Sequence, residues 1–216
     1  MSAMDNHAEG VQVGEGFYDF ETYMTRERWQ SYWYQLRAVM KYKPKTVLEI
    51  GCGTGATTQM LRRMGIEVTT FDFDASLNPD ISGDVRELEK LAGTGAYDLV
   101  CAFQVLEHIP YSDFEQTLAQ LGRVAREHVV ISLPHWGYPV ELRGQFFKKR
   151  FSLSFARKLT RPMEWKFDGQ HHWELGTNGH SLAQVRAAVA GQLPILAEYF
   201  CPDYSYHYFF ELDAHG

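Results

Sequence analysis

A short apolar run, a loop with three alternating glycines and an amphipathic segment follow one another early in the chain, and this succession constrains the fold most. The run from Thr46 to Ile50 is predicted to be a buried strand. The helix that starts near Ala56 is predicted to end at Gly65, because glycine suits the left-handed conformation after a helix. Glycines between a strand and a helix let the backbone approach a ligand closely. The pattern therefore predicts an α/β domain with a ligand site at the carboxyl end of the first strand.

Strands and helices are predicted to alternate along the rest of the chain. The further predicted strands are 67–71, a short one near Ile81, 97–103, 129–133, 195–200 and 206–212. Such alternation gives a doubly wound, mostly parallel sheet with both faces covered. The last two strands are joined by only 201–205, whereas a parallel pair needs a crossover of about a dozen residues. They are therefore predicted to form an antiparallel C-terminal hairpin.

Three helices carry sequence signals of their own. Ser112 and Ser181 each begin a capping box, in which a serine and a Glu or Gln three residues later satisfy the first backbone amides of a helix. The segment 25–40 has aromatic and apolar side chains at helical spacing and is expected to pack mainly as core. In this N-terminal helical cap, which spans 17–44, Tyr23 or Trp33 is a candidate to touch a bound ligand. The spaced residues are Trp29, Tyr32, Trp33, Leu36 and Met40.

Composition fits a single domain over residues 1–216. The 21 basic and 27 acidic residues give a net charge of −6, which argues against nucleic-acid binding because phosphate attraction needs a basic face. Three cysteines without metal spacing favour a reducing, cytoplasmic compartment. The polar first fourteen residues argue against a signal peptide, and no apolar run reaches the ~18 residues that span a bilayer.

Carboxylates stand around the glycine loop at informative distances. Asp72 ends the second strand 21 residues after Gly51, where a carboxylate accepts hydrogen bonds from ribose hydroxyls. The glycine spacing also fits the dinucleotide fingerprint, so a nicotinamide-dependent oxidoreductase is an alternative. Glu49 would repel a pyrophosphate but attract a sulfonium and an ammonium, and Asp84 can accept from an adenine amino group. With the terminal hairpin, these features favour S-adenosylmethionine.

Four segments match one known family in order and spacing. They are Val-Leu-Glu-Ile-Gly-Cys-Gly-Thr-Gly (47–55), Phe-Asp (71–72), Gly-Asp-Val (83–85) and Tyr-Asp-Leu-Val-Cys-Ala-Phe-Gln-Val-Leu-Glu-His-Ile (97–109). These residues resemble class I S-adenosylmethionine-dependent methyltransferases. The resemblance is strong over 25–133 and rests on topology alone for 181–212. It implies a seven-stranded sheet whose last strand is antiparallel.

The resemblance also implies which residues hold the methionine half of the cofactor. Gly51, Gly53 and Gly55 would line the methionine and ribose part. Glu49 would anchor the amino end through water.

Residues at the ends of the next two strands are implied to bind the adenosine half of the cofactor. Asp72 would hold the ribose, Phe73 would lie against the adenine, and Asp84 and Val85 would flank the ring. Three residues would lie beside the methionine and open toward the acceptor: Ala102, Phe103 and Gln104.

Methyl transfer from a sulfonium is an in-line displacement, so the enzyme mainly aligns and desolvates the acceptor. His108 and His135 follow strand ends on the ligand side and are the candidate general bases, with ordinary packing as the alternative for His108. No metal is expected, because His171, His172 and Glu174 are too adjacent for a regular zinc spacing, and a substrate-pocket or surface role is preferred for them.

Residues 135–180 form a long insert with a local charge of +4 and nine aromatic residues. Long connections in α/β units are often functional, and this one leaves from the ligand side of the sheet. We expect a lid that selects a small or medium acceptor of anionic or aromatic character, with Arg143, Lys148 or Arg150 meeting an anionic group. A rival interpretation takes Gln145–Leu159 as an interfacial helix at a membrane surface.

The sequence therefore predicts an S-adenosylmethionine-dependent methyltransferase of small molecules. Two alternatives remain: the oxidoreductase, and a non-catalytic S-adenosylmethionine-binding regulatory domain. The sequence sets no oligomeric state.

Overall fold

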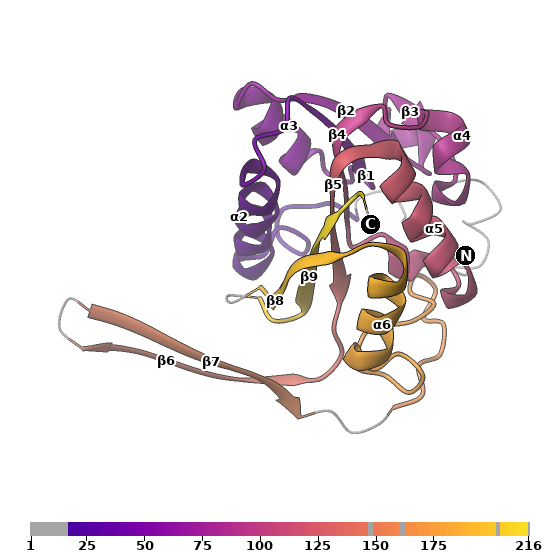
Figure 1. Cartoon of the computed structure of the whole chain (residues 1–216). Coiled ribbons are helices and arrows are strands. Elements are labelled where there is room, and N and C mark those ends of the chain that lie inside the picture. The colour runs from indigo at the N-terminus through magenta and orange to yellow at the C-terminus, as the bar shows by residue number, and fades with distance from the viewer. Residues whose placement is uncertain (1–16, 147–148, 160–162, 202–203, 216) are drawn as a thin grey trace.

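Seven strands form one twisted sheet in the computed structural model (Figure 1), which describes residues 17–146, 149–159, 163–201 and 204–215. The strand order is β3-β2-β1-β4-β5-β9-β8. Strands β3, β2, β1, β4 and β5 run parallel, and β9 is antiparallel to both β5 and β8. The predicted mostly parallel sheet with an antiparallel C-terminal hairpin is confirmed. The strands are β1 Thr46–Ile50, β2 Glu67–Asp72, β3 Ile81–Ser82, β4 Tyr97–Phe103, β5 Ala125–Pro134, β8 Ile195–Phe200 and β9 His207–Asp213.

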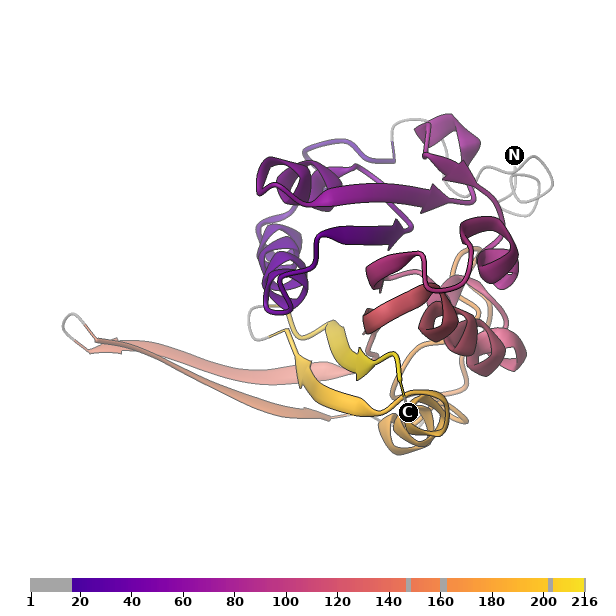
Figure 2. The ribbon, with the colours of Figure 1, turned by 45° about the horizontal axis from the view of Figure 1, so that its top comes forward.

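Helices cover both faces of this sheet (Figure 2). Helices α2 and α3 pack on one face, and α4, α5 and α6 pack on the other. Three short 3-10 turns are described: η2 lies between β2 and β3, η3 between β3 and α4, and η4 between β4 and α5. The helices are α2 Arg26–Met40, α3 Ala56–Arg63, α4 Leu88–Ala92, α5 Tyr111–Val124 and α6 Leu182–Gln192, and the turns are η2 Ala75–Leu77, η3 Val85–Glu87 and η4 Leu106–His108.

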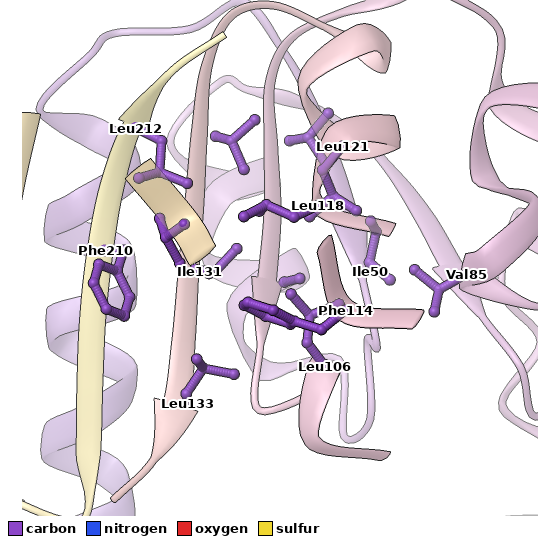
Figure 3. Close-up of a cluster of buried hydrophobic side chains, with 14 of the residues drawn as sticks. Ile50, Val85, Leu106, Phe114, Leu118, Leu121, Ile131, Leu133, Phe210 and Leu212 are labelled. Atoms are coloured by element: carbon purple, nitrogen blue, oxygen red, sulfur yellow. The ribbon is translucent and has the colours of Figure 1, made fainter. Parts of the chain in front are cut away.

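The two cores follow from the period-two alternation of the central strands. In β5, Ile131 joins the core beneath α5 and α6, whereas its neighbour Val130 joins the core beneath α2 and α3. Phe210 and Phe209 of β9 divide in the same way. Figure 3 shows Ile131 between Phe210 of β9 and the side chains of α5, all in one cluster. Because β4, β5 and β9 are apolar on both faces, the sheet is buried on both sides.

Of the two predicted capping boxes, one is confirmed and the other is wrong. Ser181 caps α6 with the complete reciprocal box. The capping box at Ser112 is wrong, because α5 already begins at Tyr111 and Ser112 lies inside its first turn. Pro110 precedes the helix with a φ of −54° and a ψ of 140°, so its ring sets the turn into the helix without a side-chain cap.

Helix α2 buries a different face from the expected one. Trp29 and Trp33 are both 56% exposed, whereas Val39 is fully buried. The inward face carries Ser31 and Gln35, which bond to the side chains of His207 (2.6 Å) and Thr57 (2.8 Å). These polar contacts select the buried face, so the expectation that the aromatic stripe forms core is wrong for both tryptophans.

The first half of the insert is a β-hairpin. Strands β6 (Tyr138–Phe146) and β7 (Lys149–Leu159) pair antiparallel and extend away from the sheet (Figures 1 and 2). The rival interfacial helix over Gln145–Leu159 is therefore wrong. A spacing of four residues, as between Phe151 and Phe155, places side chains on one face of a strand as well as of a helix. The structure does not describe the side chains of residues 138–162. The predicted anion contacts of Arg143, Lys148 and Arg150 therefore lie outside the described residues.

Residues 1–16 also lie outside the described part of the chain. Among the helices that are described, none has the length and apolarity that crossing a bilayer requires.

Candidate functional site

A cavity of about 760 Å³ lies at the carboxyl ends of β1, β2 and β4. This is the edge at which doubly wound sheets bind their ligands. The loops after these three strands line the cavity, together with the segment before α2 and the segment 167–172 of the insert. The volume falls in the range of ordinary small-molecule sites, about 300–1,000 Å³.

The glycine loop forms the cavity wall after β1. Gly51, Gly53 and Gly55 have φ values of +74°, +47° and +71°, a region that residues with a side chain rarely adopt. A Cβ atom on Gly51 would lie 2.4 Å from Cγ2 of Val105. The loop thus depends on glycine at Gly51 for both backbone conformation and space.

Asp72 lies at the end of β2 beside this loop and is 6% exposed. Its carboxylate accepts hydrogen bonds from the backbone amides of Asp74 (2.9 Å) and Gly53 (3.5 Å). Burial raises the pKa of this carboxyl group. Phe73 follows with its ring 41% exposed along the cavity. A carboxylate next to an exposed aromatic ring suits a nucleoside.

Glu49 places a buried carboxyl group at the bottom of the loop. It is 3% exposed, and the hydroxyl of Thr58 on α3 donates to it. Burial raises its pKa to about 7. An ionised carboxylate here, with so little solvent around it, would attract a cationic ligand group strongly.

Aromatic residues before α2 close the cavity from the N-terminal side. Phe17, Tyr18 and Tyr23 line it together with Tyr32 of α2, and the rings of Tyr18 and Tyr23 lie 4.8 Å apart in an edge-to-face contact. The ring of Tyr18 also lies beside the loop, 3.6–3.8 Å from where a Cβ of Gly53 would be. This segment covers the glycine loop.

The loop after β4 and the insert add Glu107, His108 and His171 to the cavity lining. Burial lowers the pKa of His108 to about 4, and its Nδ1 lies 3.0 Å from the backbone carbonyl of Gln170. Burial raises the pKa of Glu107 to about 8. Burial disfavours the charged His171, but its hydrogen bond to Glu174 and the Glu107 carboxylate outweigh this and raise its pKa.

The comparison with known families decides what kind of domain carries this cavity. A family model described as a methyltransferase domain matches residues 24–185. The chain belongs to this methyltransferase domain family.

Curated relatives of the methyltransferase domain are themselves named as methyltransferases. A ubiquinone biosynthesis O-methyltransferase of Nitrosococcus oceani is 32% identical over 80 residues, which cover 31% of this chain and 34% of the relative. The chloroplastic magnesium protoporphyrin IX methyltransferase of Arabidopsis thaliana is 30% identical over 101 residues, covering 40% and 32%. The matched segments thus span about a third of these relatives' length.

Solved structures share the fold over nearly the whole chain. The 1,6-didemethyltoxoflavin-N1-methyltransferase of Burkholderia thailandensis aligns with a TM-score of 0.59 at 18% identity, covering 99% of this chain and 91% of that one. The N-methyltransferase NodS of Bradyrhizobium japonicum aligns with a TM-score of 0.60 at 12% identity, covering 99% and 98%. At these identities the likeness concerns the fold alone.

The methyltransferase domain brings most of the predicted cofactor residues to one cavity. Its lining includes Glu49, Gly51, Gly53, Asp72, Phe73, Asp84, Val85, Phe103 and Gln104. Gly55, at the start of α3, and Ala102, buried in β4, are not part of that lining. Asp84 pairs with Arg86 (2.5 Å), whose guanidinium lowers the pKa of this carboxyl group.

The two histidines predicted as general bases lie in different places. His108 lies in the cavity wall, whereas His135 is 6% exposed, lies outside the described lining and contacts the ring of Phe200. The sequence prediction missed Tyr18 and Glu107 as lining residues, whereas His171, expected in the substrate pocket or on the surface, is part of the lining. Only the Glu-His pair of 107–108 gave a local signal, since it directly follows a strand of the ligand side.

Proposed function

We propose that this methyltransferase domain binds S-adenosylmethionine and transfers its methyl group to a small or medium acceptor molecule. The observation that carries the proposal is a cavity lined by two unlike groups of residues. The first group is the glycine loop with the carboxyl groups of Glu49 and Asp72, and the second is His108 and His171. A cofactor held by the first group would direct its methyl group toward the second.

The proposed cofactor contacts follow from the site's chemistry. Asp72 accepts the ribose hydroxyls, Phe73 lies against the adenine, and Glu49 attracts the cationic methionine end. Asp84 has its oxygens engaged by Arg86 and flanks the adenine mainly through backbone. Gly51 and Gly53 let the backbone approach the methionine.

The acceptor would bind between Phe103 and Gln104 on one side and the side chains of His108 and His171 on the other. Because the leaving group is a neutral thioether, alignment and exclusion of water supply most of the catalysis. We place His108 beside the reacting acceptor atom. His135 has no part in this proposal.

We narrow the proposed lid to the second half of the insert. Phe167, Gln170, His171 and His172 line the cavity, whereas the β6–β7 hairpin extends away from it. We therefore expect residues 167–172 to cover the part of the cavity in which the acceptor binds. We keep the reducing, cytoplasmic compartment as part of the proposal, on the sequence argument from three cysteines without metal spacing.

S-adenosylhomocysteine should raise the melting temperature of the chain, and NADH should not. A ligand that binds only the native state at 100 times its Kd stabilises it by about 2.7 kcal/mol, which corresponds to roughly 5–10 °C for a domain of this size. Differential scanning fluorimetry measures both shifts. A shift with NADH alone would favour the oxidoreductase, and binding without turnover of any acceptor in a panel would favour the regulatory domain.

The affinity for S-adenosylmethionine should fall about tenfold between pH 8 and pH 6. The pKa of Glu49 is raised to about 7, so the carboxylate that attracts the sulfonium and ammonium is mostly protonated at pH 6. Its charged neighbours, Arg62 and Asp72, lie on α3 and β2. Calorimetric titrations at several pH values measure the change.

Glu49→Gln is the control for this pH profile. The variant should bind more weakly at pH 8 and lose the tenfold dependence. An unchanged profile in the folded variant would show that Glu49 does not face the cofactor.

A further inference from the structure

We propose that Glu107, His108 and His171 bind a divalent transition-metal ion that activates a hydroxyl group of the acceptor. This inference deepens the proposed function and rests on it. It departs from the expectation of no metal, which considered His171 only together with its sequence neighbours His172 and Glu174.

The three side chains converge on one point of the cavity wall. One ligand atom from each lies within 4.8 Å of the others. Their convergence is fixed by backbone, since the amide of His172 donates to the carbonyl of Glu107 at 2.8 Å. The rings of His108 and His171 lie 4.9 Å apart, nearly perpendicular. An ion between the three needs only small side-chain shifts to reach bonding distance, about 2.0–2.2 Å.

Glu107 provides the second observation. Its side chain is fully buried, and neither carboxyl oxygen has a hydrogen-bond partner among the described residues. A buried polar group left unsatisfied costs about 1–3 kcal/mol, and more when it is charged. A bound cation would satisfy this carboxylate directly.

Both histidines are held as metal-binding histidines usually are. Nδ1 of His171 lies 2.8 Å from Glu174, whose carboxylate also accepts from the hydroxyl of Tyr206. Nδ1 of His108 must donate to the carbonyl of Gln170, because a carbonyl only accepts. In each ring this leaves Nε2 for a ligand. Such outer partners fix the tautomer and orient the ring toward a metal.

The donor set indicates the ion and the acceptor. Two imidazoles and one carboxylate suit zinc or a similar transition ion, and three protein ligands leave positions open to the cavity. An acceptor hydroxyl bound there loses its proton to solvent, because the cation lowers its pKa. The oxygen lone pair then forms the O–CH₃ bond while the electrons of the S–CH₃ bond pass to sulfur, which leaves neutral S-adenosylhomocysteine. The acceptor class is therefore a phenol or another hydroxyl compound.

Metal binding can be measured without activity. The chelator-stripped chain should bind one equivalent of Zn²⁺ by calorimetry, and Co²⁺ should give the visible absorption of a nitrogen- and oxygen-ligated ion. His171→Ala should weaken Zn²⁺ binding at least 100-fold. Glu174→Gln, which leaves the three ligands in place, should weaken it 10–100-fold. His128→Ala, on β5 outside the cavity lining, should bind as the unchanged chain does.

The same samples separate this inference from the proposed function. Stripped protein should still bind S-adenosylmethionine within a few fold, while turnover of hydroxyl acceptors should fall at least 100-fold and return with Zn²⁺. Tight cofactor binding with no Zn²⁺ or Co²⁺ bound, or with equal Zn²⁺ binding by His171→Ala, would overturn the metal site and leave the methyltransferase proposal standing. Loss of cofactor binding by both stripped and Zn²⁺-loaded protein would instead contradict the proposed function.

Discussion

Replacing Gly51 by alanine is expected to weaken S-adenosylmethionine binding at least 100-fold, about 2.7 kcal/mol. The new Cβ would lie 2.4 Å from Cγ2 of Val105, a separation that real Cβ atoms essentially never show. It would also hold a φ of +74°, which costs about 1–2 kcal/mol for a residue with a side chain. The loop must move to relieve both, and it then no longer presents its backbone to the cofactor. Calorimetric titration measures the loss.

Gly65→Ala is the matched control for this effect. Gly65 has a φ of +86° at the end of α3, and a Cβ there meets nothing within 4 Å. The variant carries the backbone strain without the clash and lies away from the cavity, so it should lose stability but keep its cofactor affinity. Wild-type affinity in a folded Gly51→Ala variant would show that the loop does not line the cofactor site.

Asp72→Ala should weaken S-adenosylmethionine binding by about 1.5–3 kcal/mol, the range for hydrogen bonds to a charged group. This corresponds to roughly 10–150-fold in Kd. The carboxylate of Asp72 is nearly buried, so the ribose hydroxyls would bond to it with little competition from water. The fold should survive, because the partners of this carboxylate are local amides of the cavity loops.

Asp80→Ala provides the comparison for Asp72. Asp80 bonds to Thr70 of β2 and pairs with Arg62, but it lies outside the cavity lining. Removing it should cost stability and leave Kd unchanged. Equal affinities for the Asp72 and Asp80 variants would place the ribose elsewhere.

The fold was predictable because its signals are local and mutually consistent. The strand, glycine loop and helix of 46–64 give one pattern, and the five-residue link 201–205 allows only an antiparallel pair. Predictions failed where a pattern fits two structures or where distant partners decide. Phe151 and Phe155 are four residues apart, which suits a strand and a helix alike.

Distant partners explain the remaining differences. The buried face of α2 depends on His207, which is 176 residues away from Ser31. The cofactor end of the cavity was predictable because Glu49, Gly51 and Asp72 all stand at strand ends next to one motif. In the acceptor part, His108 was predictable because it follows a strand of the ligand side, but the approach of His171 to Glu107 was not, because it depends on the fold of the insert.

A structure determined with S-adenosylhomocysteine tests the central claim most directly. The account predicts ribose hydroxyls within about 2.7–3.2 Å of the Asp72 carboxylate. It also predicts that the amino group of the ligand lies close to Gly51 and Glu49, and that its sulfur atom faces His108. A ligand bound elsewhere, or one whose sulfur atom faces away from His108 and His171, would contradict the account.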